Sequence, residues 1–249
     1  MNIDINCDMG ESFGRYLLGQ DSQLISRITS ANIACGFHAG NGDTIRRTIE
    51  LAMKYTVHIG AHPSFRDKEN FGRTEMHLSS EKLYAIVLEQ LIKIELIAKE
   101  KNTTLHHIKL QGALYNMAAR DRAMAKTVVQ AVNDFNDKLI FYGLSNSVMI
   151  EEAKAAGLKT ASEAFADRTY QDDGSLTPRS EANALVEDEA KAVQRVLQMV
   201  KQGTVTTVSG KIISITADTI CIHGDGKNAV GLAKNIRQAL QEIKLAKTI

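Results

Sequence analysis

The sequence predicts an α/β protein in which one parallel sheet of about seven strands forms a single domain over residues 1–249. Two observations support this. Short β-rich runs alternate with amphipathic helical patterns along the chain, and such alternation implies parallel strands joined by right-handed crossovers. Acidic, basic and histidine residues also collect just after these runs, where parallel α/β proteins build their sites. Periodicity alone is compatible with a closed barrel and with an open, doubly wound sheet.

The first strand is expected within NIDINCD, residues 2–8, where every even-numbered residue is polar and every odd-numbered residue is apolar. This period of two indicates a strand with two unlike faces. Strands of parallel sheets are usually apolar on both faces, because helices cover both sides. Either this is an edge strand wetted on one face, or its polar face looks into a polar cavity.

The other elements follow in order. Strands are expected at 3–6, 31–35, 57–61, 107–110, 139–142, 160–165 and 218–222. Helices are expected at 42–55 (with Asp43 as its N-cap), 79–100, 121–135, 146–156, 187–201 and 228–245. The stretch TVTTVSGKIISI, near 204–216, predicts a β-hairpin inserted around Ser209 and Gly210.

Composition excludes several classes of protein. The net charge is +1, with 30 basic and 29 acidic residues, so nothing indicates a nucleic-acid or membrane surface as partner. No apolar run is long enough to span a membrane, and the N-terminus lacks the features of a secretory signal. Cys7, Cys35 and Cys221 show no CxxC spacing, which predicts buried free thiols in a reducing cytoplasm.

Six strand ends carry residue types suited to catalysis or binding. They are Asp8 and Glu11; His38; His62; Lys109 and Gln111; Glu163 followed by Asp167 and Arg168; and His223 with Asp225. Because the carboxyl ends of parallel strands meet at one end of the sheet, these side chains are expected around one pocket. The polar face of NIDINCD, including Asn6, is then expected to face the same pocket.

Single features of this set allow two interpretations each. Asp8, His38 and His62 can form a two-histidine, one-carboxylate metal site, or each histidine can cap a loop. Lys109 is either an anion-binding or low-pKa lysine or an ordinary solvated one.

Arg168 either binds a substrate carboxylate or pairs with Asp167. The turn HGDG, which contains Asp225, precedes a helix whose free N–H groups can receive an anion. Neither a phosphate-binding P-loop nor G-x-G-x-x-G is present.

Six motifs taken together resemble the LamB/YcsF family, and they extend over nearly the whole chain. They are NCDMGESFG, SANIACGFHAG, GAHPSF with NFGR, KLQGALYN, FADRTYQDDG with TPRS, and CIHGDG. The resemblance implies an irregular seven-stranded (β/α) barrel, similar to the glycoside hydrolase/deacetylase superfamily. It implies one component of a 5-oxoprolinase, an enzyme that opens 5-oxo-L-proline to L-glutamate with ATP and Mg²⁺, together with partner subunits B and C. The superfamily's deacetylases hold a metal with one Asp and two His, which would correspond to Asp8, His38 and His62.

One position departs from the family pattern K-P-H-G-A-L-Y-N, because this chain has Gln111 where the pattern has histidine. Glutamine forms hydrogen bonds but carries no proton at neutral pH. We therefore expect Gln111 to bind substrate with Asn6, Arg168 and Asp225. The catalytic residues expected for acid–base catalysis are Glu11 and Asp167. Lys109 and His223 are expected to stabilise the negative charge that develops during the reaction. Two rival hypotheses are a metal-dependent deacetylase that works alone and a non-catalytic ligand-binding subunit.

Overall fold

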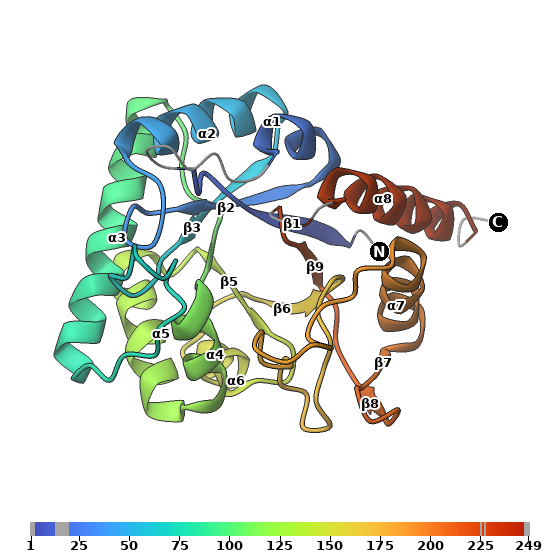
Figure 1. The fold of residues 1–249 in the computed structure, drawn as a ribbon. Helices are drawn as coiled ribbons and strands as arrows, with labels where there is room; N and C mark the ends of the chain where they lie inside the picture. Colours follow the sequence, from blue (N-terminus) through green and yellow to red (C-terminus); the bar gives the residue numbers. More distant parts are fainter. Residues whose placement is uncertain (1–2, 13–19, 225, 227, 247–249) are drawn as a thin grey trace.

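The computed structural model describes residues 3–12, 20–224, 226 and 228–246. Seven parallel strands close into a barrel in the order β1-β2-β3-β4-β5-β6-β9. The strands are β1 (Asp4–Met9), β2 (Ser30–Ala34), β3 (His58–His62), β4 (His107–Lys109), β5 (Ile140–Leu144), β6 (Thr160–Phe165) and β9 (Thr219–Ile222). The last strand, β9, pairs with both β1 and β6, so the first and last strands lie side by side in the barrel wall (Figure 1). The predicted parallel fold is confirmed, and the barrel form is the correct alternative.

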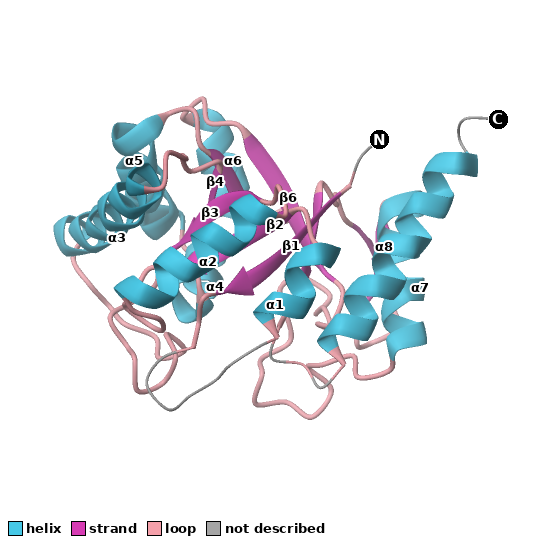
Figure 2. Ribbon diagram, turned by 90° about the horizontal axis from the view of Figure 1, so that it is seen from above, coloured by secondary structure: helices cyan, strands magenta, loops and turns pink. Residues whose placement is uncertain are grey.

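Helices surround the barrel, as the view in Figure 2 shows. They are α1 (Asp21–Leu24) with the 3₁₀ turn η1 (Ile25–Arg27), α2 (Gly42–Lys54), α3 (Ser80–Glu100), α4 (Gly112–Arg120), α5 (Arg122–Asn136), α6 (Val148–Ala155), α7 (Glu189–Gln202) and α8 (Ala229–Ala246). An antiparallel pair, β7 (Thr204–Thr206) and β8 (Ile212–Ser214), lies within the stretch expected to form a hairpin. Among the described residues, no helix is long and apolar enough to cross a membrane.

Local chemistry sets the helix boundaries, and it corrects two expectations. The N-cap of α2 is Asn41, whose side-chain oxygen accepts the N–H of Thr44 at 2.9 Å, and not Asp43, which lies in the first turn. Helix α4 is an addition to the expected elements, because the pattern of KLQGALYN indicates only a strand end. The strand stops at Lys109, and Gln111 is already the N-cap residue of α4.

The barrel interior is polar, and this explains the pattern of NIDINCD. Along β1 the apolar side chains Ile5, Cys7 and Met9 belong to the apolar core that lies between the barrel and its helices. The alternate residue Asn6 is fully buried inside the barrel, where it contacts polar side chains of β2, β6 and β9. Since β1 is paired on both edges, the edge-strand interpretation is wrong.

Candidate active site

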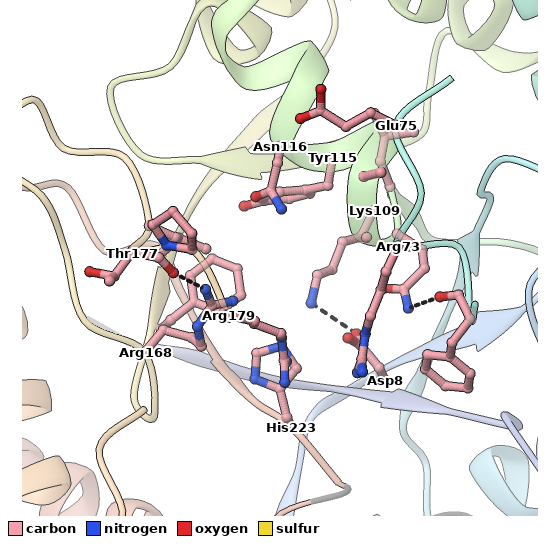
Figure 3. Close-up of a pocket in the computed structure, with 18 of the residues that line it drawn as sticks. Asp8, Arg73, Glu75, Lys109, Tyr115, Asn116, Arg168, Thr177, Arg179 and His223 are labelled. Carbon is pink, nitrogen blue, oxygen red and sulfur yellow. Dashed lines mark hydrogen bonds and ion pairs between the residues drawn. The ribbon is translucent and has the colours of Figure 1, made fainter. Parts of the chain in front are cut away.

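A pocket of about 320 Å³ lies at the carboxyl ends of the barrel strands. Figure 3 shows Arg168 and Arg179 on one side of it and Lys109 and Asp8 on the other, with His223 between them. Of the predicted site residues, those that line the pocket are Asp8, Glu11, Lys109, Gln111, Arg168 and His223. This position follows from the topology, because parallel strands deliver all their carboxyl ends to one rim.

Lys109 is the best-defined side chain of the site. Its ammonium group lies 2.8 Å from Asp8 Oδ1 and 3.1 Å from Glu163 Oε1, and all three residues are buried. Burial by itself would lower the pKa of Lys109, but the two carboxylates outweigh it and raise that pKa well above the ordinary value. Lys109 is therefore a fixed ammonium donor and not a base.

Two further groups, Cys221 and Tyr115, belong to the same buried cluster as Lys109. Cys221 Sγ lies 3.1 Å away, and burial raises the pKa of this thiol, so it stays neutral. The Tyr115 hydroxyl donates to Glu163 Oε2 at 2.7 Å and lines the pocket. Burial likewise raises the pKa of Tyr115 well above its ordinary value, so the hydroxyl remains a donor.

His223 and Asp167 form a hydrogen-bonded pair. The His223 ring Nδ1 lies 2.9 Å from the Asp167 carboxylate, which also accepts the His223 main-chain N–H. Burial opposes ionisation of Asp167, but His223 outweighs it and holds the pKa of this carboxyl below its ordinary value. The carboxylate therefore fixes the proton on Nδ1, and Nε2 carries a free lone pair. Asp167 itself does not line the main pocket; it lies behind His223.

His38 and His62 lie deeper than the pocket surface. Both are fully buried, and their rings meet edge to face at 5.5 Å. His62 Nδ1 lies 2.8 Å from the main-chain oxygen of Lys109, and its Nε2 lies 3.1 Å from the Gln111 side-chain oxygen. Neither ring nitrogen of His38 forms a hydrogen bond within the described part of the chain. Burial, reinforced by His62, lowers the pKa of His38 well below its ordinary value, so this ring is neutral.

These two histidines fit a divalent cation together with Glu11. Ligand atoms of Glu11, His38 and His62 all lie within 4.8 Å of one another, with His38 Nε2 at 3.4 Å from Glu11 Oε1. A neutral, buried imidazole without a hydrogen bond is the form that binds metal. The set differs from the expected one in its carboxylate, because Asp8 Oδ1 is bound to Lys109 and Asn32. Asp8 lies beside the group, with Oδ2 at 3.4 Å from His62.

Of the two interpretations of Arg168, the salt bridge with Asp167 is not found among the described residues, and the binding of a substrate carboxylate stays a prediction. The Arg168 guanidinium donates to the main-chain oxygens of Ala184 and Thr177, so it holds the loop after β6 in place. Burial, followed by the nearby charge of Arg179, lowers the pKa of Arg168 to about 10. Arg179, from the same loop, lines the pocket and forms no ion pair with any described residue.

Asp225 lies outside the described residues. Asn6 lies below the pocket, inside the barrel, where it donates to Glu163 at 2.9 Å. The sequence placed Glu163 among the strand-end residues of the pocket but gave it no role, and the structure shows that it binds Lys109 and Tyr115. Sequence reasoning missed the pocket positions of Tyr115 and Arg179, which lie within the quoted motifs KLQGALYN and TPRS.

Comparison with known proteins gives a consistent result. The LamB/YcsF family model matches residues 3–248. The A subunit of 5-oxoprolinase from Oceanobacillus iheyensis is 50% identical over 239 residues, covering 96% of this chain and 93% of that protein. The A subunit of 5-oxoprolinase from Bordetella pertussis is 46% identical over 244 residues, covering 98% and 97%.

Solved structures agree with this assignment. The lactam utilization protein from Thermus thermophilus is 40% identical and superposes with a TM-score of 0.91, covering 98% of both chains. A GH113 β-1,4-mannanase, only 9% identical, has a TM-score of 0.55 over 97% of this chain and 99% of its own, which shows a shared barrel fold alone. The family match over nearly the full length and the relatives at about half identity agree with the six motifs, and the chain therefore belongs to the LamB/YcsF family.

Proposed function

We propose that this chain is the A subunit of an ATP-dependent 5-oxoprolinase, which hydrolyses the lactam bond of 5-oxo-L-proline to give L-glutamate. The observation that carries the proposal is that relatives matching the chain almost from end to end are A subunits of 5-oxoprolinase by name. The geometry supports it, because a fixed ammonium donor and a carboxylate-oriented histidine face one small pocket. Amide hydrolysis requires both a base for water and donors for the oxyanion.

His223 is suited to activate the water. Its Nε2 lone pair can take a proton from water as the water attacks the lactam carbonyl carbon. The same nitrogen can then return the proton to the departing ring nitrogen as the C–N bond breaks. Asp167 acts through His223, because its carboxylate fixes the tautomer and stabilises the imidazolium ion that forms between the two steps.

Lys109 is suited to stabilise the oxyanion on the former carbonyl oxygen. Its position is fixed by Asp8 and Glu163 before substrate arrives, so little reorganisation is needed during the reaction. Arg179 is the guanidinium available for the carboxylate of 5-oxoproline, since Arg168 is committed to main-chain oxygens. Gln111 can offer its amide to the ring of the substrate from the opposite side.

A divalent ion, if bound, would be held by Glu11, His38 and His62, and it would polarise the carbonyl oxygen as a Lewis acid. ATP with Mg²⁺ is part of the proposal, since coupling to ATP offsets the stability of the amide. The partners proposed are subunits B and C, and a multisubunit enzyme is supported by the relatives, each of which is one lettered subunit by name. We also propose that the enzyme works in the cytoplasm.

The test is glutamate formation from 5-oxo-L-proline and Mg-ATP by the purified chain with and without subunits B and C. We expect turnover with the partners and little or none by the chain alone. Robust ATP-coupled glutamate release by the isolated chain would contradict the need for partners. No glutamate under either condition would contradict the proposed function itself.

A metal-dependent hydrolase that works alone is the second candidate, and the Glu11, His38 and His62 group favours it. Metal analysis of the purified chain, repeated with His38→Gln, separates the two. A stoichiometric ion that His38→Gln loses, together with amide hydrolysis independent of ATP and partners, would support this alternative. An ion at that site without independent hydrolysis would leave the 5-oxoprolinase proposal in place.

A further inference from the structure

A continuous column of hydrogen bonds runs through the barrel interior below the pocket. His107, at the start of β4, lies 2.8 Å from Asn32 Oδ1 through its Nε2. The Asn32 amide nitrogen in turn donates to Asn6 Oδ1 and to Asp8 Oδ1, each at 2.8 Å. Asp8 Oδ1 also binds the Lys109 ammonium. All members of the column are buried.

The direction of each hydrogen bond follows from chemistry. The carboxylate of Asp8 and the side-chain oxygen of Asn6 only accept, so the amide nitrogen of Asn32 must point towards them. The Asn32 oxygen then faces His107, which must donate from Nε2. Burial, reinforced by His106, lowers the pKa of His107 well below its ordinary value, and so the ring is a neutral Nε2–H tautomer.

The barrel is built to accommodate this ring. His107 stacks on Tyr142, with ring centroids 4.2 Å apart and an interplanar angle of 18°. On its other side a Cβ atom at Gly60 would lie 2.1 Å from His107 Nε2, so only glycine leaves room for the ring at that point of β3. His107 Nδ1 lies 3.3 Å from His106 Nδ1 at the amino end of β4. The ring is therefore held on every side in the orientation that Asn32 requires.

We propose that His107 and Asn32 are positioning residues of the site, which fix the Asp8 carboxylate, and through it the Lys109 ammonium, from inside the barrel. Asn32 supplies Asp8 with a second donor at the oxygen that binds Lys109. His107 fixes the direction of the Asn32 amide, which could otherwise rotate its oxygen towards Asp8. This inference rests on the proposed function, because it says which residues hold Lys109, the proposed oxyanion donor, in position.

The activity test compares two replacements of His107 in the chain assembled with subunits B and C. His107→Gln retains an N–H donor for Asn32, whereas His107→Phe retains a flat ring without a donor. We expect His107→Phe to lower kcat for glutamate formation about tenfold with KM nearly unchanged, since one buried acceptor loses its partner. His107→Gln should restore kcat to within about threefold of the wild type.

Tyr142→Phe is the matched control, because it keeps the stacked ring and removes only a hydroxyl that lies 3.3 Å from Ser30 Oγ. We expect its kcat to be unchanged. Equal kcat values for His107→Phe and His107→Gln would overturn the proposal, because a role in filling space does not distinguish a donor from its absence.

A second measurement does not depend on activity or on how well the Phe variant folds. In the ¹⁵N-histidine-labelled full chain, Asp8→Asn should shift the ring Nε2–H resonance of His107, because Asn32 connects the two. Glu11→Gln, which removes a different charge from the same pocket, should leave it in place. The inference would be overturned if His107 carried no proton at Nε2, or if both variants shifted its Nε2–H resonance equally. Absence of glutamate formation by the wild-type complex would instead overturn the proposed function.

Discussion

The Lys109 side chain illustrates how surroundings decide the chemistry of one residue. The sequence left it open whether this lysine has a lowered pKa, binds an anion or is solvated. Two buried carboxylates raise its pKa, so the first and last interpretations do not hold. Two carboxylates around one ammonium leave a net negative charge below the pocket. This charge favours a bound cation beside Asp8.

Asp167→Asn should lower kcat for glutamate formation by about 10²-fold or more, because the histidine loses the carboxylate that fixes its tautomer. KM should change little, since Asp167 does not line the pocket. Initial rates of the assembled enzyme over a range of 5-oxoproline concentrations measure both. Asp173→Asn is a control of the same chemical type in the same loop, where Asp173 only accepts from Ser175. Comparable losses for both variants would indicate a general effect on the loop.

Gln111→His should change the rate by less than tenfold, which is under about 1.4 kcal/mol in the barrier. The Gln111 side chain lies at 3.1 Å from His62 and 3.5 Å from the Phe71 main-chain oxygen, so it acts through hydrogen bonds that a histidine can partly replace. Gln111→Ala should cost more, because those partners lose a hydrogen bond. A large gain in rate for Gln111→His, with a new ionisation near neutral pH, would show that a histidine here carries protons.

At the scale of elements, the junction between β4 and α4 determines where Gln111 lies. Gly112 has φ +58°, and a Cβ atom there would lie 2.3 Å from the main-chain oxygen of Gly72. That oxygen accepts a hydrogen bond from the N–H of Ala113 at 2.8 Å, so the first turn of α4 packs directly against the NFGR loop, residues 70–73. The close contact between two backbones holds Gln111 and Arg73 at the same side of the pocket.

Gly112→Ala should therefore lower the free energy of unfolding by about 2–4 kcal/mol, from left-handed strain and a backbone clash together. Gly210→Ala is the control, because Gly210 has φ +89° but no atom within 4 Å of the added Cβ. The free energy of unfolding of Gly210→Ala should fall by only about 1 kcal/mol. Urea unfolding of both variants measures the difference. If Gly112→Ala destabilised the protein no more than Gly210→Ala does, the loop around Gly72 would have to move away from the added Cβ atom without loss of stability.

Sequence patterns locate the elements well but not their junctions. Strand 160–165 has the bounds that the sequence predicts, because a short β-rich run lies there between two helical patterns. Helix α4 escapes prediction, since only Leu110 and Gln111 separate it from β4, so no loop signal marks its start. Arg179 could not be identified as a pocket residue, because its position depends on a loop held by Arg168 through main-chain oxygens. Such contacts depend on tertiary structure and leave no periodic signal.

For the whole molecule, buried ionisable groups predict a stability that falls on the acid side. His38 and His107 have lowered pKa values, so they are neutral when folded but bind protons when unfolded below about pH 6.5. The unfolded state then holds more protons, and stability must fall as the pH falls. Asp8 and Asp167 also have lowered pKa values, so their contribution is present above about pH 4 and is lost below it.

Unfolding free energies from urea titrations between pH 8 and pH 4 check this expectation. We expect a decline that begins near pH 6.5 and steepens near pH 4. His38→Gln should make the decline of the unfolding free energy below about pH 6.5 less steep, because one group that must release a proton on folding is removed. Constant stability down to about pH 5 would contradict the assignment of these two histidines as neutral in the folded protein.

The pairing of β9 with β1 has a consequence for how the protein is made. Asp4 accepts a hydrogen bond from Thr219, which lies 215 residues further along the chain, and Asn6 is similarly far from its partners in β6 and β9. While a ribosome is still synthesising the chain, β1 therefore has one open edge and a row of polar side chains without partners. The barrel wall and its buried charges can therefore assemble only after β9 has emerged from the ribosome. A nascent chain stalled before β9 would expose that edge to other chains, so the first strand depends on the last for its protection.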